Sequence, residues 1–271
     1  MEKIISVDLK ADFGFLKKPD TNEPIYLSFN MLHKPALLGI LGAILGLGGF
    51  SEAKEEELKQ PKQGKKRKTI LPKYFEELKE LKIGIKPLQD ENGNFQKTVI
   101  KYSNGVGYAN LDGNLIISEQ TLIKPAYRCY LLLENDNELH TQLYDYLKNS
   151  KAEYLPYLGK NDFSVWWDNF QEYDIKSFSS TEKSFKLSSV FIKEQTLKEG
   201  VQRSKGFKPR PTPNSKFMYF ENLPVGYNID LMQYEYEAFA YTDWELQRDY
   251  EVNDLYELTS PDNKHEIIQL F

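Results

Sequence analysis

The sequence predicts an α+β fold in which a ferredoxin-like domain is followed by a β-rich C-terminal region. Apolar strands and two helices follow one another in the order strand, helix, strand, strand, helix, strand, which is the order of a ferredoxin-like unit. A hairpin-like insertion interrupts this order at residues 89–118, and aromatic-rich short strands recur from Ser164 onward. We therefore expect a ferredoxin-like core over residues 1–163 and a β-rich region over residues 164–271.

Composition limits the class of protein. The chain has 271 residues, of which 40% are hydrophobic and 14% aromatic, and its mean hydropathy is −0.58. These values exclude a disordered chain and a membrane protein, and the length allows a sizeable core. The net charge of −5 argues against nucleic-acid binding through bulk charge. Any RNA affinity must then come from local basic patches, stacking and backbone groups. No targeting segment is evident, so we expect a cytoplasmic protein without a membrane partner.

The first strand is predicted over residues 3–9, KIISVDL, and a loop with Gly14 follows it. Phe13 and Phe15 flank that glycine. Their rings have two uses that the sequence does not separate. They can pack in the core, or they can stack on the bases of single-stranded RNA.

A strongly apolar helix is predicted within residues 33–50, HKPALLGILGAILGLGGF. Pro35 suits the first helical turn, and Gly48 with Gly49 suits a left-handed exit. Apolar residues surround the whole circumference, which predicts burial on nearly every side. The stretch is too short for a membrane span and lacks the spacing of a nucleotide-binding glycine loop. The interpretation as a buried core helix without a ligand therefore remains open.

Glycines form one face of this helix, because Gly39, Gly42 and Gly46 are spaced by three and four residues. Each glycine costs about 1 kcal/mol relative to alanine in a helix interior. We expect this face to allow the close approach of another backbone, either RNA or a neighbouring strand.

The next segment changes from acidic to basic and is expected to be an exposed excursion over residues 51–68. Its basic cluster is either a solvated loop or a phosphate-contacting finger; it consists of Lys62, Lys65, Lys66, Arg67 and Lys68. A short helix over residues 73–82 and the strand KIGIKPL, ended by Pro87, should follow.

Three Asx-Gly turn signals mark the insertion over residues 89–118 as hairpin-like; they are Asn92–Gly93, Asn104–Gly105 and Asp112–Gly113. Lys97 and Lys101 should share one face of a strand in it. Residues 120–134 are predicted to form a single central strand covered on both faces. Cys129 is the one cysteine in the chain, which excludes an internal disulfide or a cysteine-based zinc site, and its apolar neighbours predict an inert buried thiol.

The amphipathic helix that follows should begin behind Asn137 as its cap. After it, Gly159 with Lys160 and Asn161 predicts a tight turn that presents backbone N–H groups beside a cation. This combination suits a phosphate oxygen. In the β-rich half, the basic, proline-rich loop over residues 203–213 is either a surface connector or an RNA or partner contact.

The opening of the chain resembles a known family. The order KIISVDL, ADFGFLKKP, YLSFN and HKPALLGILGAILGL is similar to that of the CRISPR-associated RAMP proteins, and more narrowly to the Cas-five family of type I-B-like systems. The resemblance implies a Cascade subunit that caps the 5′ handle of crRNA. It also implies that residues 89–118 are a thumb that folds over the guide RNA beside the first backbone subunit. Leu158-Gly159-Lys160 matches the Leu-Gly-Arg/Lys turn of this family.

Together these interpretations predict one RNA-binding site. His33 and Lys34 would meet phosphate at the helix N-terminus, where the helix dipole favours anions. The remaining RNA-binding residues that we predict are Gly39, Gly42, Lys97, Lys101, Arg128, Gly159, Lys160 and Asn161. The expected partners are the crRNA 5′ handle, the backbone RAMP subunit and the large subunit of Cascade, with target DNA left open. We predict no catalytic residue, metal or cofactor.

Two other functions remain as alternatives. Some members of the family cut repeat RNA without a metal, using a tyrosine, a lysine and a histidine, which requires a histidine that titrates near neutrality. The histidines are His33, His140 and His265. His265 follows Lys264, but in the C-terminal tail and not in the middle of the chain. The first alternative is thus an endoribonuclease that uses His33 or His265; the second is a purely structural assembly subunit.

Overall fold

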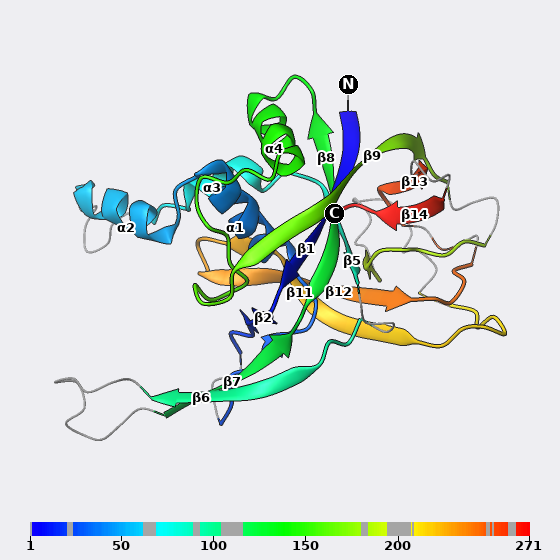
Figure 1. Ribbon diagram of the computed structural model, residues 1–271, viewed down its shortest axis with the longest axis horizontal. Helices are drawn as coiled ribbons and strands as arrows, with labels where there is room; N and C mark the ends of the chain where they lie inside the picture. Colours follow the sequence, from blue (N-terminus) through cyan, green and yellow to red (C-terminus); the bar gives the residue numbers. More distant parts are fainter. Residues whose placement is uncertain are drawn as a thin grey trace.

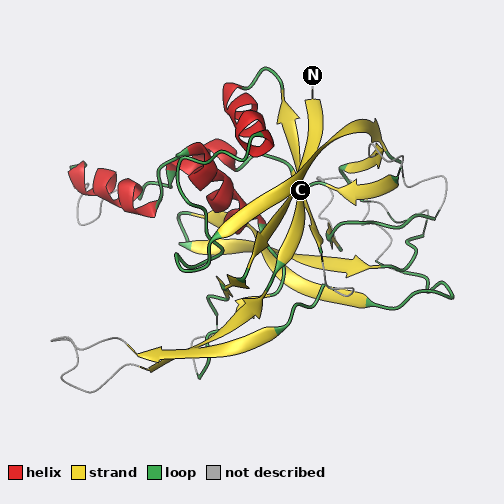
Figure 2. Ribbon diagram, viewed as in Figure 1, coloured by secondary structure: helices red, strands yellow, loops and turns green. Residues whose placement is uncertain are grey.

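The computed structural model describes residues 2–20, 24–61, 69–88, 93–103, 116–179, 184–193, 207, 209–247, 250, 252–259 and 264–271. Its centre is a six-stranded sheet with helices packed against one face (Figures 1 and 2). It is therefore the mixed α/β protein that the sequence predicts.

The central sheet has the strand order β14-β13-β9-β1-β8-β5. All of its pairs are antiparallel. Its strands are β1 (Glu2–Ala11), β5 (Ile83–Pro87), β8 (Ala126–Glu134), β9 (Val165–Ser177), β13 (Leu255–Thr259) and β14 (His265–Gln269). β9 joins β1 to β13, so one sheet contains strands from both sides of the expected boundary at residue 163.

The two faces of this sheet are buried by different elements. Ile5, Val7 and Leu9 of β1 lie in the main core with helices α1 (Lys34–Leu45), α3 (Lys73–Leu78) and α4 (Glu138–Lys148). Ile4 of β1 belongs to a second cluster, with Leu258 of β13 and Ile268 of β14. Alternate residues of one strand thus fill separate cores, as the pleat of a strand requires. This explains the near-continuous burial of β1 and β8.

Helix α1 is buried all round, as predicted, since none of its twelve residues is exposed. His33 caps its N-terminus and Pro35 lies in the first turn. The predicted exit at Gly48–Gly49 is wrong. The left-handed residue is Gly46, with φ +72°, and its N–H donates to the carbonyl oxygen of Ala43. The helix therefore ends at Gly46, because glycine adopts this left-handed conformation at little cost.

The glycine face of α1 is covered by a side chain and not by a backbone. A Cβ at Gly42 would overlap the Cβ of Tyr74 and lie 2.9 Å from its Cγ. Gly46 faces Glu153 in the same way, whereas Gly39 has only the rim of the Tyr74 ring, at 3.9 Å. The expectation of close approach is correct at Gly42, but the approaching group is the tyrosine of α3.

The segment expected to be an excursion contains a helix, whereas the predicted start of the amphipathic helix is confirmed. Helix α2 (Phe50–Lys59) occupies the first part of the expected excursion and projects from the body as an arm in which only Ala53 is buried (Figure 1). The basic cluster, within residues 62–68, lies outside the described residues. Helix α4 begins as predicted, because Oδ1 of Asn137 accepts hydrogen bonds from the N–H groups of Leu139 and His140.

The single strand predicted over residues 120–134 is two strands. β7 (Ile116–Ile123) ends at Lys124, which has φ +48°, and β8 starts after Pro125. A positive φ and a proline without an N–H break the ladder there. β7 pairs antiparallel with β6 (Lys97–Ser103) and with β2 (Phe13–Gly14). The β6–β7 pair forms a second arm (Figure 1), and the predicted turns at 104–105 and 112–113 lie outside the described residues.

The C-terminal region is rich in strands. β11 (Met218–Asn228) and β12 (Gln233–Thr242) form a long antiparallel ladder, and β10 (Phe191–Ile192) pairs with β12. The short strands β3 (Leu16–Lys17) and β4 (Ser28–Phe29) pair near the N-terminus. In the described part of the chain, no single helix reaches the length and apolarity of a membrane span; α1 and α2 do so only as a pair bent by 82°.

Candidate nucleic-acid interface

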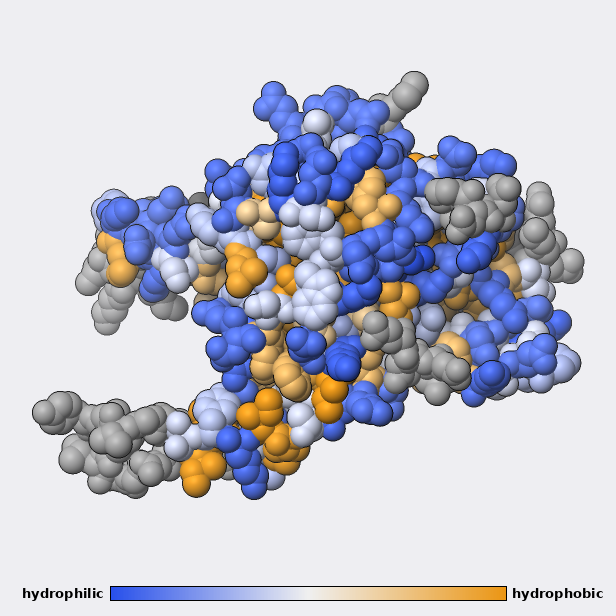
Figure 3. Space-filling model, in the orientation of Figure 1, coloured by the Kyte–Doolittle hydropathy of each residue, from blue (hydrophilic) through white to orange (hydrophobic). Residues whose placement is uncertain are grey.

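A groove of about 800 Å³ opens beside α1. In Figure 3 the surface is deeply notched between the α2 arm and the β6–β7 arm, and residues from both arms line the groove. Its wall is formed by α1, the start of α2, α3, residues 15–17, residues 154–160 and the ends of two C-terminal strands. The contributing side chains and backbone include Phe15, Lys17, His33, Ala36, Gly39, Phe50, Tyr74, Glu119, Tyr154, Tyr157, Gly159, Lys160, Tyr227 and Tyr234.

The groove brings together four of the ten residues predicted to bind RNA: His33 and Gly39 from α1 and its cap, and Gly159 and Lys160 from the turn that follows α4. These two segments are more than a hundred residues apart in the sequence. The other six predicted residues do not line it; they are Lys34, Gly42, Lys97, Lys101, Arg128 and Asn161.

The Gly159 turn is held against the loop that follows β1. Gly159 has φ +83°, and a Cβ there would overlap the carbonyl oxygen of Phe15 and lie 2.7 Å from its carbonyl carbon. The N–H of Phe15 donates to the carbonyl oxygen of Leu158 at 3.1 Å. Glycine is therefore required by the protein's own packing at this turn, which places Lys160 and Asn161 at a defined position.

Lys160 connects this turn to the β6–β7 arm. Its Nζ lies 2.7 Å from Oε2 of Glu119, a residue only 5% exposed, and 4.5 Å from the centre of the Tyr102 ring. The hydroxyl of Tyr102 donates to the other oxygen of Glu119 at 2.6 Å. Burial is the largest single effect and lowers the pKa of Lys160, but the hydrogen bond and charge of Glu119, together with Tyr102, raise it by more, so the pKa is raised overall. The cation persists at neutral pH, shared between the groove and Glu119.

His33 lines the groove as a neutral ring. Its Nδ1 accepts a hydrogen bond from the N–H of Ala36 at 3.3 Å, and the ring packs edge-on against Phe29, with 5.2 Å between centroids. Burial lowers the pKa of His33 to about 3. The ring therefore carries no positive charge at neutral pH to attract a phosphate, and it is a poor general base for RNA cleavage. It retains one neutral N–H donor.

Lys34 points away from the groove. Its Nζ donates to the backbone carbonyl of Phe271 at 3.1 Å, and burial lowers its pKa. The structure thus separates His33 and Lys34, which the sequence placed together on one phosphate. The lysine instead ties α1 to the C-terminal residue.

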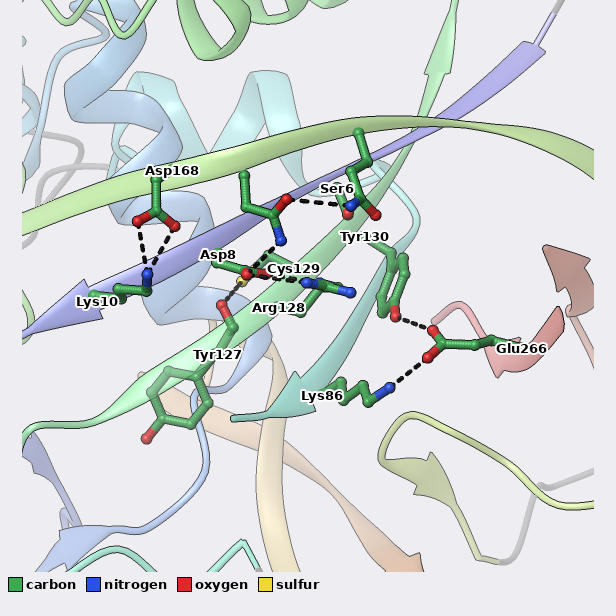
Figure 4. A network of polar contacts seen from close by, with 12 residues as sticks. Ser6, Asp8, Lys10, Lys86, Tyr127, Arg128, Cys129, Tyr130, Asp168 and Glu266 are labelled. Atoms are coloured by element: carbon green, nitrogen blue, oxygen red, sulfur yellow. Dashed lines mark hydrogen bonds and ion pairs between the residues drawn. The ribbon is translucent and has the colours of Figure 1, made fainter. Parts of the chain in front are cut away.

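Arg128 lies on the other face of the central sheet, in the network of Figure 4. Its Nε and Nη2 donate to the two carboxylate oxygens of Asp8 at 2.7 and 3.0 Å, and Asn169 donates to the same carboxylate. The hydrogen bond to Asp8 raises the pKa of Arg128 further. This bidentate pair occupies the guanidinium and joins β8, β1 and β9.

The remaining predicted residues are not brought together with the groove. Lys97 and Lys101 are four residues apart on β6, where the Nζ of Lys97 donates to Oδ1 of Asn94 at 2.8 Å and Lys101 is exposed. Asn161 is exposed in the turn next to Lys160, and Gly42 is covered by Tyr74.

Sequence reasoning missed the aromatic lining of the groove. Tyr154 and Tyr157 are 56% and 45% exposed and lie directly before the Gly159 turn. The run YLPYLGK contains both, so a local signal existed. Tyr227 and Tyr234 are directly opposite each other in the β11–β12 ladder. No local pattern connects those two with α1, because only the fold brings them to its N-terminus.

No group of three or more metal-ligating side chains occurs in the described part of the chain. In the same part, burial raises the pKa of Tyr74 to about 12 and also raises that of Tyr234. Both hydroxyls in the groove are therefore protonated near neutral pH. The groove offers aromatic rings, neutral donors and two cations, which is a chemistry suited to single-stranded nucleic acid.

Comparison with known proteins gives structural neighbours alone. No family model matches the chain, and no curated protein matches it. Among solved structures, the chain is similar to a CRISPR protein from Archaeoglobus fulgidus, with 14% identity, a TM-score of 0.48, and coverage of 99% of this chain and 100% of that one. It is also similar to a chain of a CRISPR RNA-guided surveillance complex, with 11% identity, a TM-score of 0.44 and 90% coverage of both chains.

A third similar structure is a Type III-B Cmr-beta complex bound to cognate target RNA and AMPPnP. Its identity is 11%, its TM-score is 0.44, and the match covers 91% of this chain and 86% of that one. The structural neighbours of this chain named above are CRISPR proteins or chains of CRISPR assemblies, the class of protein that its sequence resembles.

Proposed function

We propose that this chain is a non-catalytic RNA-binding subunit of a type I CRISPR surveillance complex, of the I-B branch, and that its groove binds the 5′ handle of crRNA. One observation carries the proposal. The N-terminus of α1 and the Leu-Gly-Lys turn, both predicted as RNA contacts, meet in one groove lined by exposed tyrosines. The chain's net charge of −5 makes such a local site necessary.

The groove can bind a single strand without base pairing. Stacking of a base on an aromatic side chain contributes about 1–3 kcal/mol, and Tyr154 and Tyr157 present their rings at the mouth. Lys160 and Lys17 supply the cations for the backbone of the strand. A phosphate at Lys160 would share the ammonium group with Glu119.

The proposal includes a ferredoxin-like core and a thumb. The order β1, α1, β5, β8, α4, β9 with the antiparallel sheet order β9-β1-β8-β5 supports the first. The β6–β7 arm supports the second, because it projects beside the groove and exposes Lys101 and Val99. We propose that this arm closes over the RNA next to the adjacent backbone subunit.

Replacing Lys160 with alanine tests the phosphate contact. We expect Lys160→Ala to weaken binding of a labelled 5′-handle RNA and to reduce the slope of log affinity against log salt by about one unit. Binding is measured by fluorescence anisotropy at several salt concentrations. Lys86→Ala is the matched control, because Lys86 is similarly exposed (21% against 25%) and similarly paired, with Glu266 at 2.6 Å, but lies outside the groove. Equal slopes for both variants would remove Lys160 from the site.

A gel with labelled repeat RNA in EDTA separates the proposed function from its alternatives. We expect the purified protein to shift RNA that carries the 5′ handle and to leave it uncut, since His33 is neutral and hydrogen-bonded as a helix cap. Cleavage that His33→Ala or His265→Ala abolishes would establish the endoribonuclease instead. A purely structural subunit would give no shift and no RNA crosslink at the Gly159 turn within the assembled complex.

A further inference from the structure

One corner of the groove differs in chemistry from the rest. It is formed by His33 at the cap of α1 and by Tyr227 and Tyr234 of the β11–β12 ladder, and we call these three residues the histidine corner. The rings of His33 and Tyr234 lie 6.2 Å apart at an angle of 61°, and those of Tyr234 and Tyr227 lie 5.7 Å apart at 78°. The corner therefore consists of three aromatic rings set at steep angles, with no cation among them.

His33 brings an N–H donor without a protein partner to this corner. The side chain is 94% buried, since only 6% of its surface is exposed, and Nδ1 is used by the N–H of Ala36. The proton of the neutral ring is then on Nε2, which has no hydrogen-bond partner among the described residues although the side chain lines the groove. Nε2 is not among the fully buried polar side-chain atoms without a partner, which in the described residues are Thr121 Oγ1 and Trp244 Nε1, so it reaches the solvent of the groove. A ligand acceptor can replace water at this donor.

The groove beside His33 is lightly filled at Gly39. Gly39 lies six residues after the cap of α1 and lines the same groove, and the nearest side chain to a Cβ at Gly39 is the Tyr74 ring at 3.9 Å. Tyr74 and Tyr234 add protonated hydroxyls. A planar group with one or two hydrogen-bond acceptors fits these walls better than a tetrahedral anion does, because the groove's cations, Lys17 and Lys160, belong to other segments.

We propose that the histidine corner binds one unstacked nucleobase of single-stranded RNA, with Nε2–H of His33 donating to a carbonyl oxygen or ring nitrogen of the base while Tyr227 and Tyr234 pack against it. This inference rests on the proposed function and deepens it, because it assigns a base-specific contact to a groove otherwise described by stacking and phosphate binding. It also replaces the phosphate contact predicted for His33.

The test uses 5′-handle RNAs that each lack one base at a different position, with affinity measured by fluorescence anisotropy on the full chain. For the wild-type protein, we expect removal of one particular base to weaken binding about tenfold, in line with the contribution of one stacked base, and removal of its neighbours to have a smaller effect. His33→Asn keeps a capping side chain but removes the imidazole. We expect it to reduce that position-dependent loss to the level of the neighbours.

Two variants of Tyr234 and one control variant separate the loss of its ring from general damage to the β11–β12 ladder. Tyr234→Ala should abolish the position dependence and Tyr234→Phe should retain most of it. Phe220→Ala, on β11 of the same ladder, should leave it unchanged, because Phe220 is 51% exposed, packs against Phe207 and lies outside the groove lining. If wild-type protein binds every base-deleted RNA equally well, the histidine corner does not bind a base, and the proposed function stands. If it binds no repeat RNA, alone or in the assembled complex, both are overturned.

Discussion

Gly159→Ala should destabilise the protein and abolish RNA binding by the groove. The residue has φ +83°, and the added Cβ would overlap the carbonyl oxygen of Phe15. A left-handed conformation alone costs a non-glycine residue about 1–2 kcal/mol, and the clash is with backbone, which a rotamer change does not relieve. We expect a loss of at least about 2 kcal/mol in the free energy of unfolding, measured by urea denaturation.

Gly39→Ala is the control that distinguishes this effect from glycine replacement in general. Gly39 is in the interior of α1, its conformation is helical, and the nearest atom to a new Cβ is 3.9 Å away. Alanine is favoured over glycine in a helix by about 1 kcal/mol. The free energy of unfolding should therefore rise for Gly39→Ala and fall for Gly159→Ala. A Gly159→Ala protein as stable as the wild type would contradict the docked geometry of the turn.

Acid should destabilise the protein through His33 over a defined range of pH. In the unfolded chain His33 has the ordinary pKa of 6.5, whereas in the folded protein burial lowers it to about 3. Between these values the unfolded state binds a proton that the folded state does not, so acidification favours unfolding. The stability that the neutral ring contributes is complete above pH 6.5 and is lost at about 1.4 kcal/mol per pH unit as the pH falls towards 3.

His33→Asn isolates this contribution, because asparagine is a favourable helix cap and does not titrate. We expect the difference in unfolding free energy between wild type and His33→Asn to shift in favour of the variant as the pH falls from 6.5 to 4. Carboxylates that titrate in the same range are common to both proteins and cancel. Parallel stability curves for the two proteins would mean that His33 is accessible and titrates normally.

The order of secondary structure was predictable because local patterns determine it. The apolar circumference of α1, the cap at Asn137 and the apolar strand β1 are all readable within ten to fifteen residues, and the structure confirms them. The predictions for the end of α1 and for a single strand over residues 120–134 were wrong. At both points the deciding feature was a positive φ, at Gly46 and at Lys124, in a stretch that supplied competing signals nearby.

The candidate site was predictable only in part. Gly159 and Lys160 stand out as a turn beside a cation, and His33 as a residue at the N-terminus of a helix. Sequence reasoning therefore found two of the segments that line the groove. It placed His33 and Lys34 together on one phosphate, whereas burial keeps His33 neutral and Lys34 donates to the carbonyl of Phe271. Desolvation depends on what covers a residue, and that is set by segments far away in the sequence.

The sequence by itself therefore determined where most of the core strands and helices lie, which helix is buried, and that a tight turn occurs at Gly159. Those properties follow from hydrophobic periodicity, capping and backbone sterics, which act over a few residues. Only the tertiary structure decided that Tyr227 and Tyr234 lie beside His33, that Glu119 shares Lys160, and that Asp8 occupies Arg128. Each of these contacts joins residues from separate elements, and its energy depends on a distance that no local pattern encodes.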